Sequence, residues 1–128
     1  MKNETKIWLE YAKENLESSK VLLESKLYNP CLQNIQQSVE KAIKAILIEK
    51  SIRLKKTHSI NELKNILDEN KLDTRLSEDD CDFLDSIYLP SKYPMVNVLP
   101  FYEPNEEICQ RGIKVAESVI QTVQNIIK

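Results

Sequence analysis

Apolar residues recur every three or four positions along most of this chain, which is the spacing that gathers them on one face of an α-helix. The pattern predicts five helical segments. The first covers about residues 3–25. Its predicted apolar face consists of Trp8, Tyr11, Ala12, Leu16, Ser19, Leu22 and Leu23.

The second segment has the strongest pattern and begins near Pro30. We expect Asn29 to cap this helix, because an asparagine side chain can accept a hydrogen bond from an unpaired N–H of the first turn. Pro30 suits the first helical position, where the missing N–H is no loss. The apolar stripe that follows consists of Cys31, Leu32, Ile35, Val39, Ala42, Ile43, Ile46 and Leu47.

Three further segments follow with their own start signals. Residues 59–62 form a capping-box pattern, Ser-Ile-Asn-Glu, that predicts the start of the third helix. The fourth starts near Ser77, and the fifth begins after Pro104 with Asn105 as its cap and runs to the end of the chain. The predicted apolar positions are Leu63, Ile66 and Leu67 in the third helix, Cys81, Leu84, Ile87 and Tyr88 in the fourth, and Ile108 to Ile127 at helical spacing in the fifth.

Gly112, the only glycine of the chain, lies on the apolar face of the fifth predicted helix. A glycine inside a helix costs about 1 kcal/mol relative to alanine. We therefore expect a neighbouring helix to approach closely at this position. The amphipathic segments together predict an all-α bundle of about five helices in a single domain, residues 1–128.

The composition agrees with this fold class. Of the 128 residues, 41% are hydrophobic and 30% are charged, and no apolar run approaches the roughly 18 residues that span a bilayer. The first residues lack the apolar core of a signal peptide, so we expect a cytoplasmic protein. Each of the three cysteines, Cys31, Cys81 and Cys109, falls on a predicted apolar face, which favours buried thiols. We expect no metal and no cofactor, since there is one histidine and no close cysteine pair.

The net charge of −2 is unevenly distributed. Residues 1–64 carry 12 basic and 8 acidic side chains, whereas residues 65–128 carry 6 and 12. Such an asymmetry is compatible with a basic patch that faces phosphates, with complementary faces for an assembly, or with ordinary solvated helix faces.

Two connections between the predicted helices contain candidate functional residues. Residues 50–58, KSIRLKKTH, are strongly basic. Residues 90–104 contain four of the five prolines, and a loop of that length in a small domain is often functional. Pro90 and Pro94 favour extended geometry in the residues before them, so Lys92 and Tyr93 are predicted to lie in a stiff, non-helical segment that suits a binding group.

The order of these features resembles the HEPN family of small helical prokaryotic proteins. The likeness rests on QSVEKA at residues 37–42 followed by Lys44, on Thr57 and His58 before the third helix, and on KYP at residues 92–94. It covers almost the whole chain. In the family the last motif is arginine–tyrosine–proline, so Lys92 replaces an arginine and loses the bidentate fork that suits a phosphate.

The resemblance implies an up-and-down bundle with a four-helix-like core plus an extra helix, frequently as a homodimer. It also implies a toxin–antitoxin-like pairing with a minimal nucleotidyltransferase as partner protein. Some members are metal-independent ribonucleases, and others are thought to bind nucleotides. The ribonuclease members carry an arginine followed, after four to six residues, by a histidine, and Arg53 and His58 satisfy that spacing.

Two interpretations of His58 follow. In the catalytic one, His58 acts as general base or acid on RNA while Arg53 stabilises charge on the phosphate. In the structural one, His58 precedes the Ser59 cap and packs against Leu63. The resemblance also makes Lys92 a phosphate ligand, with Tyr93 or Tyr88 stacking on a base.

The sequence therefore favours a HEPN-type protein that binds nucleotide or RNA. If the protein is an enzyme, we expect a metal-independent endoribonuclease. The basic residues Lys55 and Lys56 are further candidates for the binding surface. Gln36 and Glu40 are expected at the polar border of the second helix, where Glu40 either forms a surface pair with Lys44, four residues later, or belongs to a polar rim around a dimer cleft. The alternative is a non-catalytic helical module that pairs with itself or with another helical protein.

Overall fold

The computed structural model describes residues 1–92 and 104–127, with the side chains of residues 88–92 excepted. Over these residues the fold is all-α, as predicted. The five helices are α1 (Asn3–Glu24), α2 (Tyr28–Glu49), α3 (Ile60–Glu69), α4 (Glu78–Lys92) and α5 (Glu106–Ile127). None of the helices in the described part of the chain combines the length and the apolar character of a membrane span.

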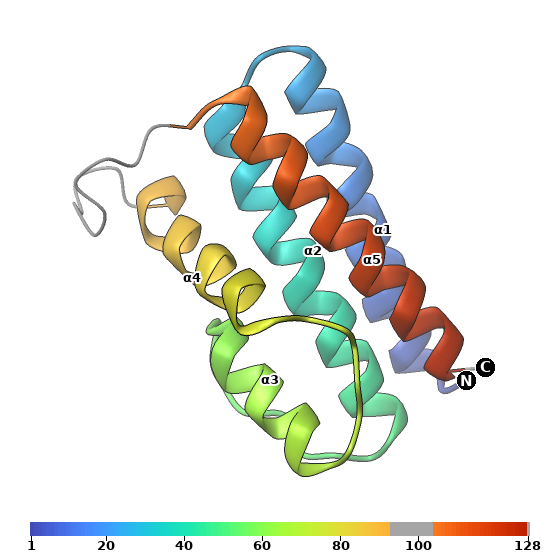
Figure 1. Ribbon diagram of the computed structural model, residues 1–128. Coiled ribbons are helices and arrows are strands. Elements are labelled where there is room, and N and C mark those ends of the chain that lie inside the picture. Colours follow the sequence, from blue (N-terminus) through green and yellow to red (C-terminus); the bar gives the residue numbers. More distant parts are fainter. Residues whose placement is uncertain (93–103, 128) are drawn as a thin grey trace.

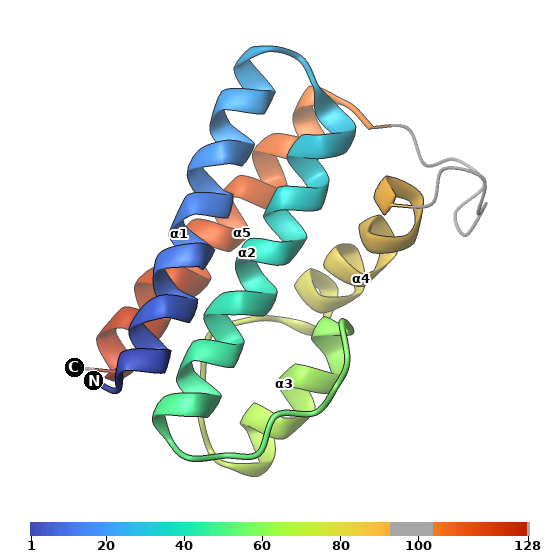
Figure 2. The same cartoon turned by 180° about the vertical axis from the view of Figure 1, so that it is seen from behind.

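Helices α1, α2 and α5 lie side by side along the length of the molecule (Figure 1). Helix α4 packs against α2 on the other side, and the short α3 lies at the lower end next to α4 (Figures 1 and 2). The chain runs up α1, down α2, up α4 and down α5, so the predicted up-and-down bundle with one extra helix is confirmed. Helix α2 is at the centre, and all eight residues of its predicted apolar stripe are completely buried.

The predicted apolar face of the first helix is partly wrong. The buried line of α1 is Thr5, Leu9, Ala12, Leu16 and Ser19. Trp8 is only partly buried, and Tyr11 is 51% exposed. Both aromatic residues precede a buried position by one residue. They therefore lie beside the buried line of α1 and not on it. A large aromatic side chain is hydrophobic enough to be predicted in the core, even where the rotation of the helix places that side chain near the surface.

Two of the predicted helix boundaries differ in the structure. Helix α2 begins at Tyr28 after Leu27, with no side-chain cap, so the prediction of Asn29 as its cap is wrong. Pro30 still lies in the first turn, where backbone N–H groups have no partner within the helix. Helix α4 continues through Pro90 to Lys92, so the predicted loop does not start at residue 90. The dihedral angle φ of proline fits a helix, and its ring nitrogen removes one hydrogen bond near the helix end.

Two predicted caps, Ser59 and Asn105, are confirmed, and Ser77, near which the fourth helix was predicted to start, is a cap as well. Ser59 accepts a hydrogen bond from the backbone of Glu62 at 3.3 Å, and Ser77 accepts one from Asp80 at 3.0 Å. Asn105 Oδ1 accepts one from the backbone N–H of Ile108 at 2.9 Å. The three cysteines are buried as predicted. Removal from water raises the pKa of Cys31 to about 12 and that of Cys81 to about 11.

The close approach predicted at Gly112 is also confirmed, and Ile35 of α2 is the neighbour. A Cβ atom at Gly112 would lie 2.9 Å from Ile35 Cδ1 and 3.0 Å from Ile35 Cγ2. Ile35 is completely buried and branched at Cβ, so its side chain has little freedom to move away.

We therefore expect Gly112→Ala to lower the free energy of unfolding by about 1 kcal/mol, because the overpacking exceeds the gain in helix propensity. Urea unfolding followed by circular dichroism measures this. In an Ile35→Ala background the same substitution is expected to stabilise the protein, since the clashing atoms are gone. An equal loss in both backgrounds would contradict the proposed contact.

Candidate functional site

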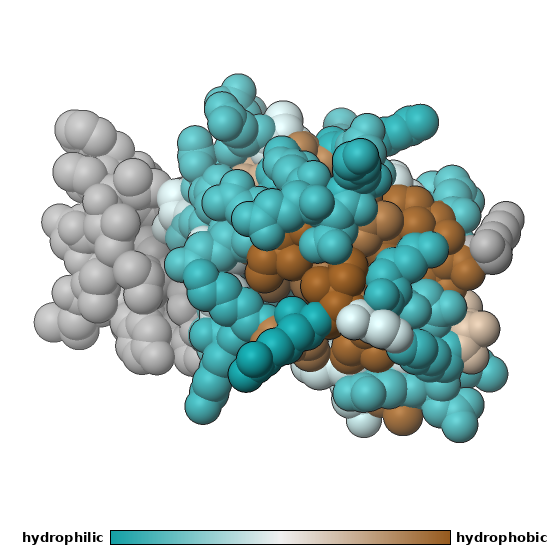
Figure 3. All heavy atoms as spheres, turned by 90° about the horizontal axis from the view of Figure 1, so that it is seen from below, coloured by the Kyte–Doolittle hydropathy of each residue, from teal (hydrophilic) through white to brown (hydrophobic). Residues whose placement is uncertain are grey.

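The connection between α2 and α3 is held at both ends. At its start, Ser51 has a φ of 58°, and the N–H of Ile52 donates to the carbonyl of Leu47 at 2.8 Å, which is the hydrogen-bond pattern of a Schellman motif. Ile52 and Leu54 are partly buried against the core. Seen from the lower end, apolar atoms are visible between the polar side chains that surround them (Figure 3). The basic residues of this connection therefore lie on a segment that is packed against the bundle.

At the other end of the connection, Asp85 of α4 binds the start of α3. Its carboxylate accepts hydrogen bonds from the backbone of Ile60 at 2.6 Å and of Asn61 at 3.1 Å, and from Ser59 Oγ at 3.0 Å. A carboxylate at a helix N-terminus satisfies unpaired N–H groups and interacts favourably with the helix dipole. This contact fixes the residues around Ser59, and hence the neighbouring His58, relative to α4.

His58 lies at the surface beside α2. Its side chain is 59% exposed, and its Nδ1 atom is 3.1 Å from Glu40 Oε1. The carbonyl oxygen of His58 accepts a hydrogen bond from Gln36 Nε2 at 3.0 Å. The structure shows a histidine in contact with a carboxylate of the central helix. The packing of His58 against Leu63 stays a prediction.

Glu40 is the residue around which the polar contacts of this site converge. The predicted pair of Glu40 and Lys44 is present, with Glu40 Oε2 at 2.7 Å from Lys44 Nζ. The pair is not on the surface as predicted, because the two side chains are only 10% and 12% exposed. An ionised carboxylate can only accept hydrogen bonds, so Nδ1 of His58 carries the proton in this contact. In the neutral ring the lone pair is then on Nε2.

Gln36 completes the site from one turn earlier on α2. The sequence suggested a position at the polar border of the helix, but the side chain is 1% exposed. Its Nε2 atom lies 3.4 Å from Glu40 Oε1. Its Oε1 atom is buried and has no hydrogen-bond partner among the described residues. Leaving a buried amide oxygen unpaired costs about 1–3 kcal/mol.

The other predicted site residues are divided between described and undescribed parts of the chain. Arg53, Lys55 and Lys56 are exposed on the connection that carries His58. Lys55 Nζ is 3.3 Å from Glu62 Oε2. The pKa of Glu62 is lowered, first by a hydrogen bond from Thr57 and then by Lys55. Lys92 is the last residue of α4, but its side chain and those of Tyr88 and Tyr93 lie outside the described residues.

The sequence did not predict two contacts between lysines of α2 and aromatic rings of α1. Lys44 Nζ lies 5.7 Å from the centroid of the Trp8 ring, and Lys41 Nζ lies 5.7 Å from that of Tyr11. The periodicity of each helix could not predict these contacts, because they depend on how the two antiparallel helices are aligned. Helices α1 and α2 lie side by side on the face turned toward the viewer in Figure 2.

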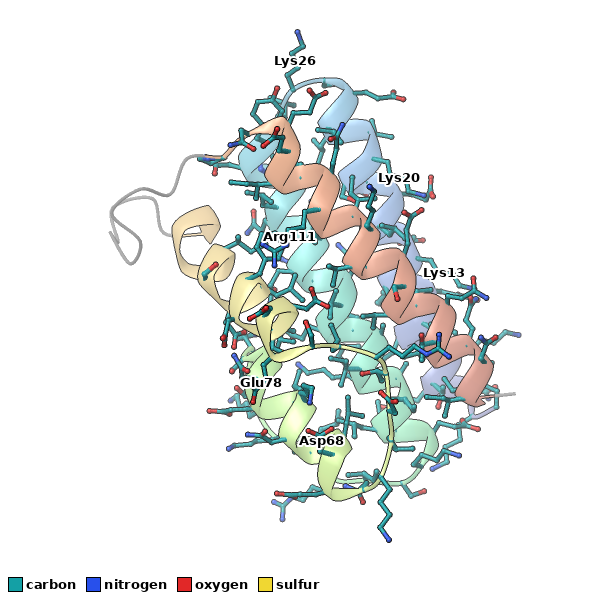
Figure 4. All side chains as sticks on the ribbon, in the orientation of Figure 1. Lys13, Lys20, Lys26, Asp68, Glu78 and Arg111 are labelled. Atoms are coloured by element: carbon teal, nitrogen blue, oxygen red, sulfur yellow. The ribbon has the colours of Figure 1, made fainter. Side chains whose placement is uncertain are left out.

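A cavity of about 660 Å³ lies elsewhere, between the end of α1 and the start of α5. Its lining carries charges of both signs, including Lys20, Lys26, Glu106 and Lys114. Figure 4 shows Lys20 and Lys26 on this side of the molecule. None of its lining residues belongs to the site around His58. Among the described residues there is no group of three or more His, Cys, Asp or Glu side chains that could hold a metal ion.

These observations define a class of protein: a small up-and-down helical bundle whose central helix holds an exposed histidine through a buried glutamate. The sequence model of the HEPN domain matches residues 5–126. The chain therefore belongs to the HEPN domain family.

Several known proteins are similar to this chain, and one of them is named as a HEPN homologue. "Putative toxin MJ1304" of Methanocaldococcus jannaschii is 27% identical over 133 residues, which cover 96% of this chain and 88% of that protein. The crystal structure of ST0689, an archaeal HEPN homologue, is 26% identical with a TM-score of 0.74 and covers 100% of both chains. The crystal structure of TT1696 from Thermus thermophilus is 25% identical with a TM-score of 0.79, covering 97% of this chain and 98% of that one.

Proposed function

We propose that this HEPN protein binds RNA and cleaves it by a metal-independent reaction that depends on His58. The observation that carries the proposal is the contact between exposed His58 and buried Glu40. A general base needs a fixed orientation and access to its substrate. The contact with Glu40 supports the first requirement, and the 59% exposure of the side chain supports the second. The similarity to a protein named "Putative toxin" supports a toxin-like role. By the family resemblance, we propose a minimal nucleotidyltransferase as its partner protein.

The chemistry is a transesterification within the RNA strand. His58 Nε2 takes the proton of a 2′-hydroxyl, the 2′-oxygen attacks the adjacent phosphorus, and the bond from phosphorus to the 5′-oxygen breaks. The leaving 5′-oxygen takes a proton from water, and His58 returns its proton to the hydroxide so formed. The products are a 2′,3′-cyclic phosphate and a 5′-hydroxyl end. Arg53, five residues before His58 on the same connection, is the cation that would stabilise charge on the pentavalent phosphorus.

Substrate binding is proposed to extend along the basic connection and the end of α4. Lys55 and Lys56 are exposed near His58 in the sequence, and Lys92 ends α4. By the family resemblance Lys92 binds a phosphate, while Tyr93 or Tyr88 stacks on a base. The protein is proposed to act as a homodimer, as is frequent in the family.

The proposal predicts that the purified protein cleaves end-labelled RNA in the presence of EDTA. The products should carry cyclic phosphate and 5′-hydroxyl ends, because the nucleophile is the neighbouring 2′-hydroxyl. An RNA with 2′-O-methyl groups is the matched control and should remain intact. Cleavage that disappears with EDTA, or that also occurs in the methylated RNA, would contradict the mechanism. Absence of both cleavage and RNA binding would contradict the function.

A further inference from the structure

The exposed face formed by α1 and α2 carries two aromatic rings, each with a lysine next to it. Trp8 lies beside Lys44 and Tyr11 beside Lys41, with the same distance of 5.7 Å from ammonium nitrogen to ring centroid in both pairs. Trp8 and Tyr11 are three residues apart on α1, and Lys41 and Lys44 are three residues apart on the antiparallel α2. The two pairs therefore lie one after the other along the same two helices. Three residues of a helix rise about 4.5 Å, which is the spacing of the two pairs along the face.

Neutral amides continue the same face beyond the two pairs. Asn15 Nδ2 donates to Asn34 Oδ1 at 2.9 Å, and Lys41 Nζ donates to Asn15 Oδ1 at 2.8 Å. The outward positions of α2 between residues 34 and 44 recur at helical spacing and include no carboxylate. On α1 the exposed Glu4 lies one turn before Trp8, at the end of this face.

This face is continuous with the histidine site through one lysine. Lys44, which lies over Trp8, is also the partner of Glu40 at 2.7 Å. Glu40 in turn contacts Nδ1 of His58 at 3.1 Å. Glu40 is 7% exposed and is engaged with both neighbours, so it presents little negative charge to a ligand on the face. A strand bound along the aromatic pairs would therefore lead to His58.

We propose that this face binds single-stranded RNA, with bases stacking on Tyr11 and Trp8 and a phosphate contacting Lys41. The inference rests on the RNA-directed function proposed above and assigns it a binding surface. Every base has an aromatic face, so stacking on exposed rings binds single strands with little dependence on sequence. The bases of duplex RNA are stacked within the helix and are not accessible to such rings. Tyr11 is 51% exposed, which makes it the more accessible of the two aromatic residues.

The chain contains a single tryptophan, Trp8, which provides a direct probe of the face. Titration with a 2′-O-methyl oligouridylate, which has no attacking hydroxyl, is expected to quench tryptophan fluorescence to saturation. Tyr11→Ala should weaken the affinity about tenfold, whereas Tyr11→Phe, which keeps the ring, should leave it nearly unchanged. Lys41→Gln should reduce the slope of log affinity against log salt concentration by about 0.7, the value for one phosphate contact in a single strand.

Lys13→Gln is the matched control for charge, because Lys13 is an exposed lysine of α1, the helix of Tyr11, and lies on the face visible in Figure 4. It should change neither the affinity nor the salt slope. If the RNA is bound and cleaved but Tyr11→Ala and Lys41→Gln bind as tightly as the wild type, the binding face is wrong and the proposed function stands. A duplex that binds as tightly as the single strand would overturn the preference for single strands. Failure of the wild type to bind any RNA would overturn both proposals.

Discussion

His58→Ala is expected to lower the rate of RNA cleavage by about 10²–10⁴-fold, the usual contribution of one positioned general base. The substitution removes the ring whose Nδ1 atom contacts Glu40 and whose Nε2 atom would accept the 2′-hydroxyl proton. Affinity for the methylated oligonucleotide should change little, because the aromatic and lysine contacts proposed for binding remain. Initial rates on end-labelled RNA, together with the fluorescence titration, separate the two effects.

Glu40→Gln tests whether the carboxylate positions the histidine. The amide has nearly the same shape but no charge, and its NH₂ group can face His58 in place of an oxygen, so Nδ1 no longer has to carry the proton. We expect a loss in cleavage rate smaller than that of His58→Ala. The double variant should cleave no more slowly than His58→Ala alone, since a positioning residue acts only through the group that it positions. Cleavage by His58→Ala at the wild-type rate would remove this residue from the reaction.

The periodicity of apolar residues was sufficient to predict the central helix and its core. All eight predicted positions of α2 are buried, because a helix surrounded by others on several sides shows its apolar stripe with little ambiguity. The first helix was predicted less well, since Trp8 and Tyr11 are hydrophobic enough to be assigned to the core although they lie at its edge. Hydrophobicity alone does not separate a core aromatic residue from one that lies exposed beside a lysine.

The candidate site was only partly predictable for a different reason. His58 was found from its neighbours in the sequence, but its contact with Glu40 joins residues 18 positions apart. The anchoring of the same connection by Asp85 joins residues 25 positions apart. Such contacts depend on the tertiary arrangement of α2, α3 and α4, which no local pattern encodes. The same applies to the burial of Glu40, which the spacing to Lys44 suggested as an ordinary surface pair.

Glu40→Ala is expected to lower the free energy of unfolding by about 3–5 kcal/mol, as when one partner of a buried ion pair is removed. The variant leaves Lys44, whose side chain is 12% exposed, without its carboxylate at 2.7 Å. It also removes an acceptor for His58 and Gln36. Urea unfolding measures the loss.

The chain offers a matched control in the pair of Lys64 and Asp68. It has the same spacing of four residues and a similar separation of 2.8 Å, but the Asp68 side chain is 56% exposed. Asp68→Ala should therefore cost no more than about 0.5 kcal/mol. In the double variant Glu40→Ala and Lys44→Met, the uncompensated charge is gone and much of the lost stability should return. A double variant as unstable as Glu40→Ala would mean that Glu40 stabilises the fold through His58 and Gln36, and that its pairing with Lys44 contributes little.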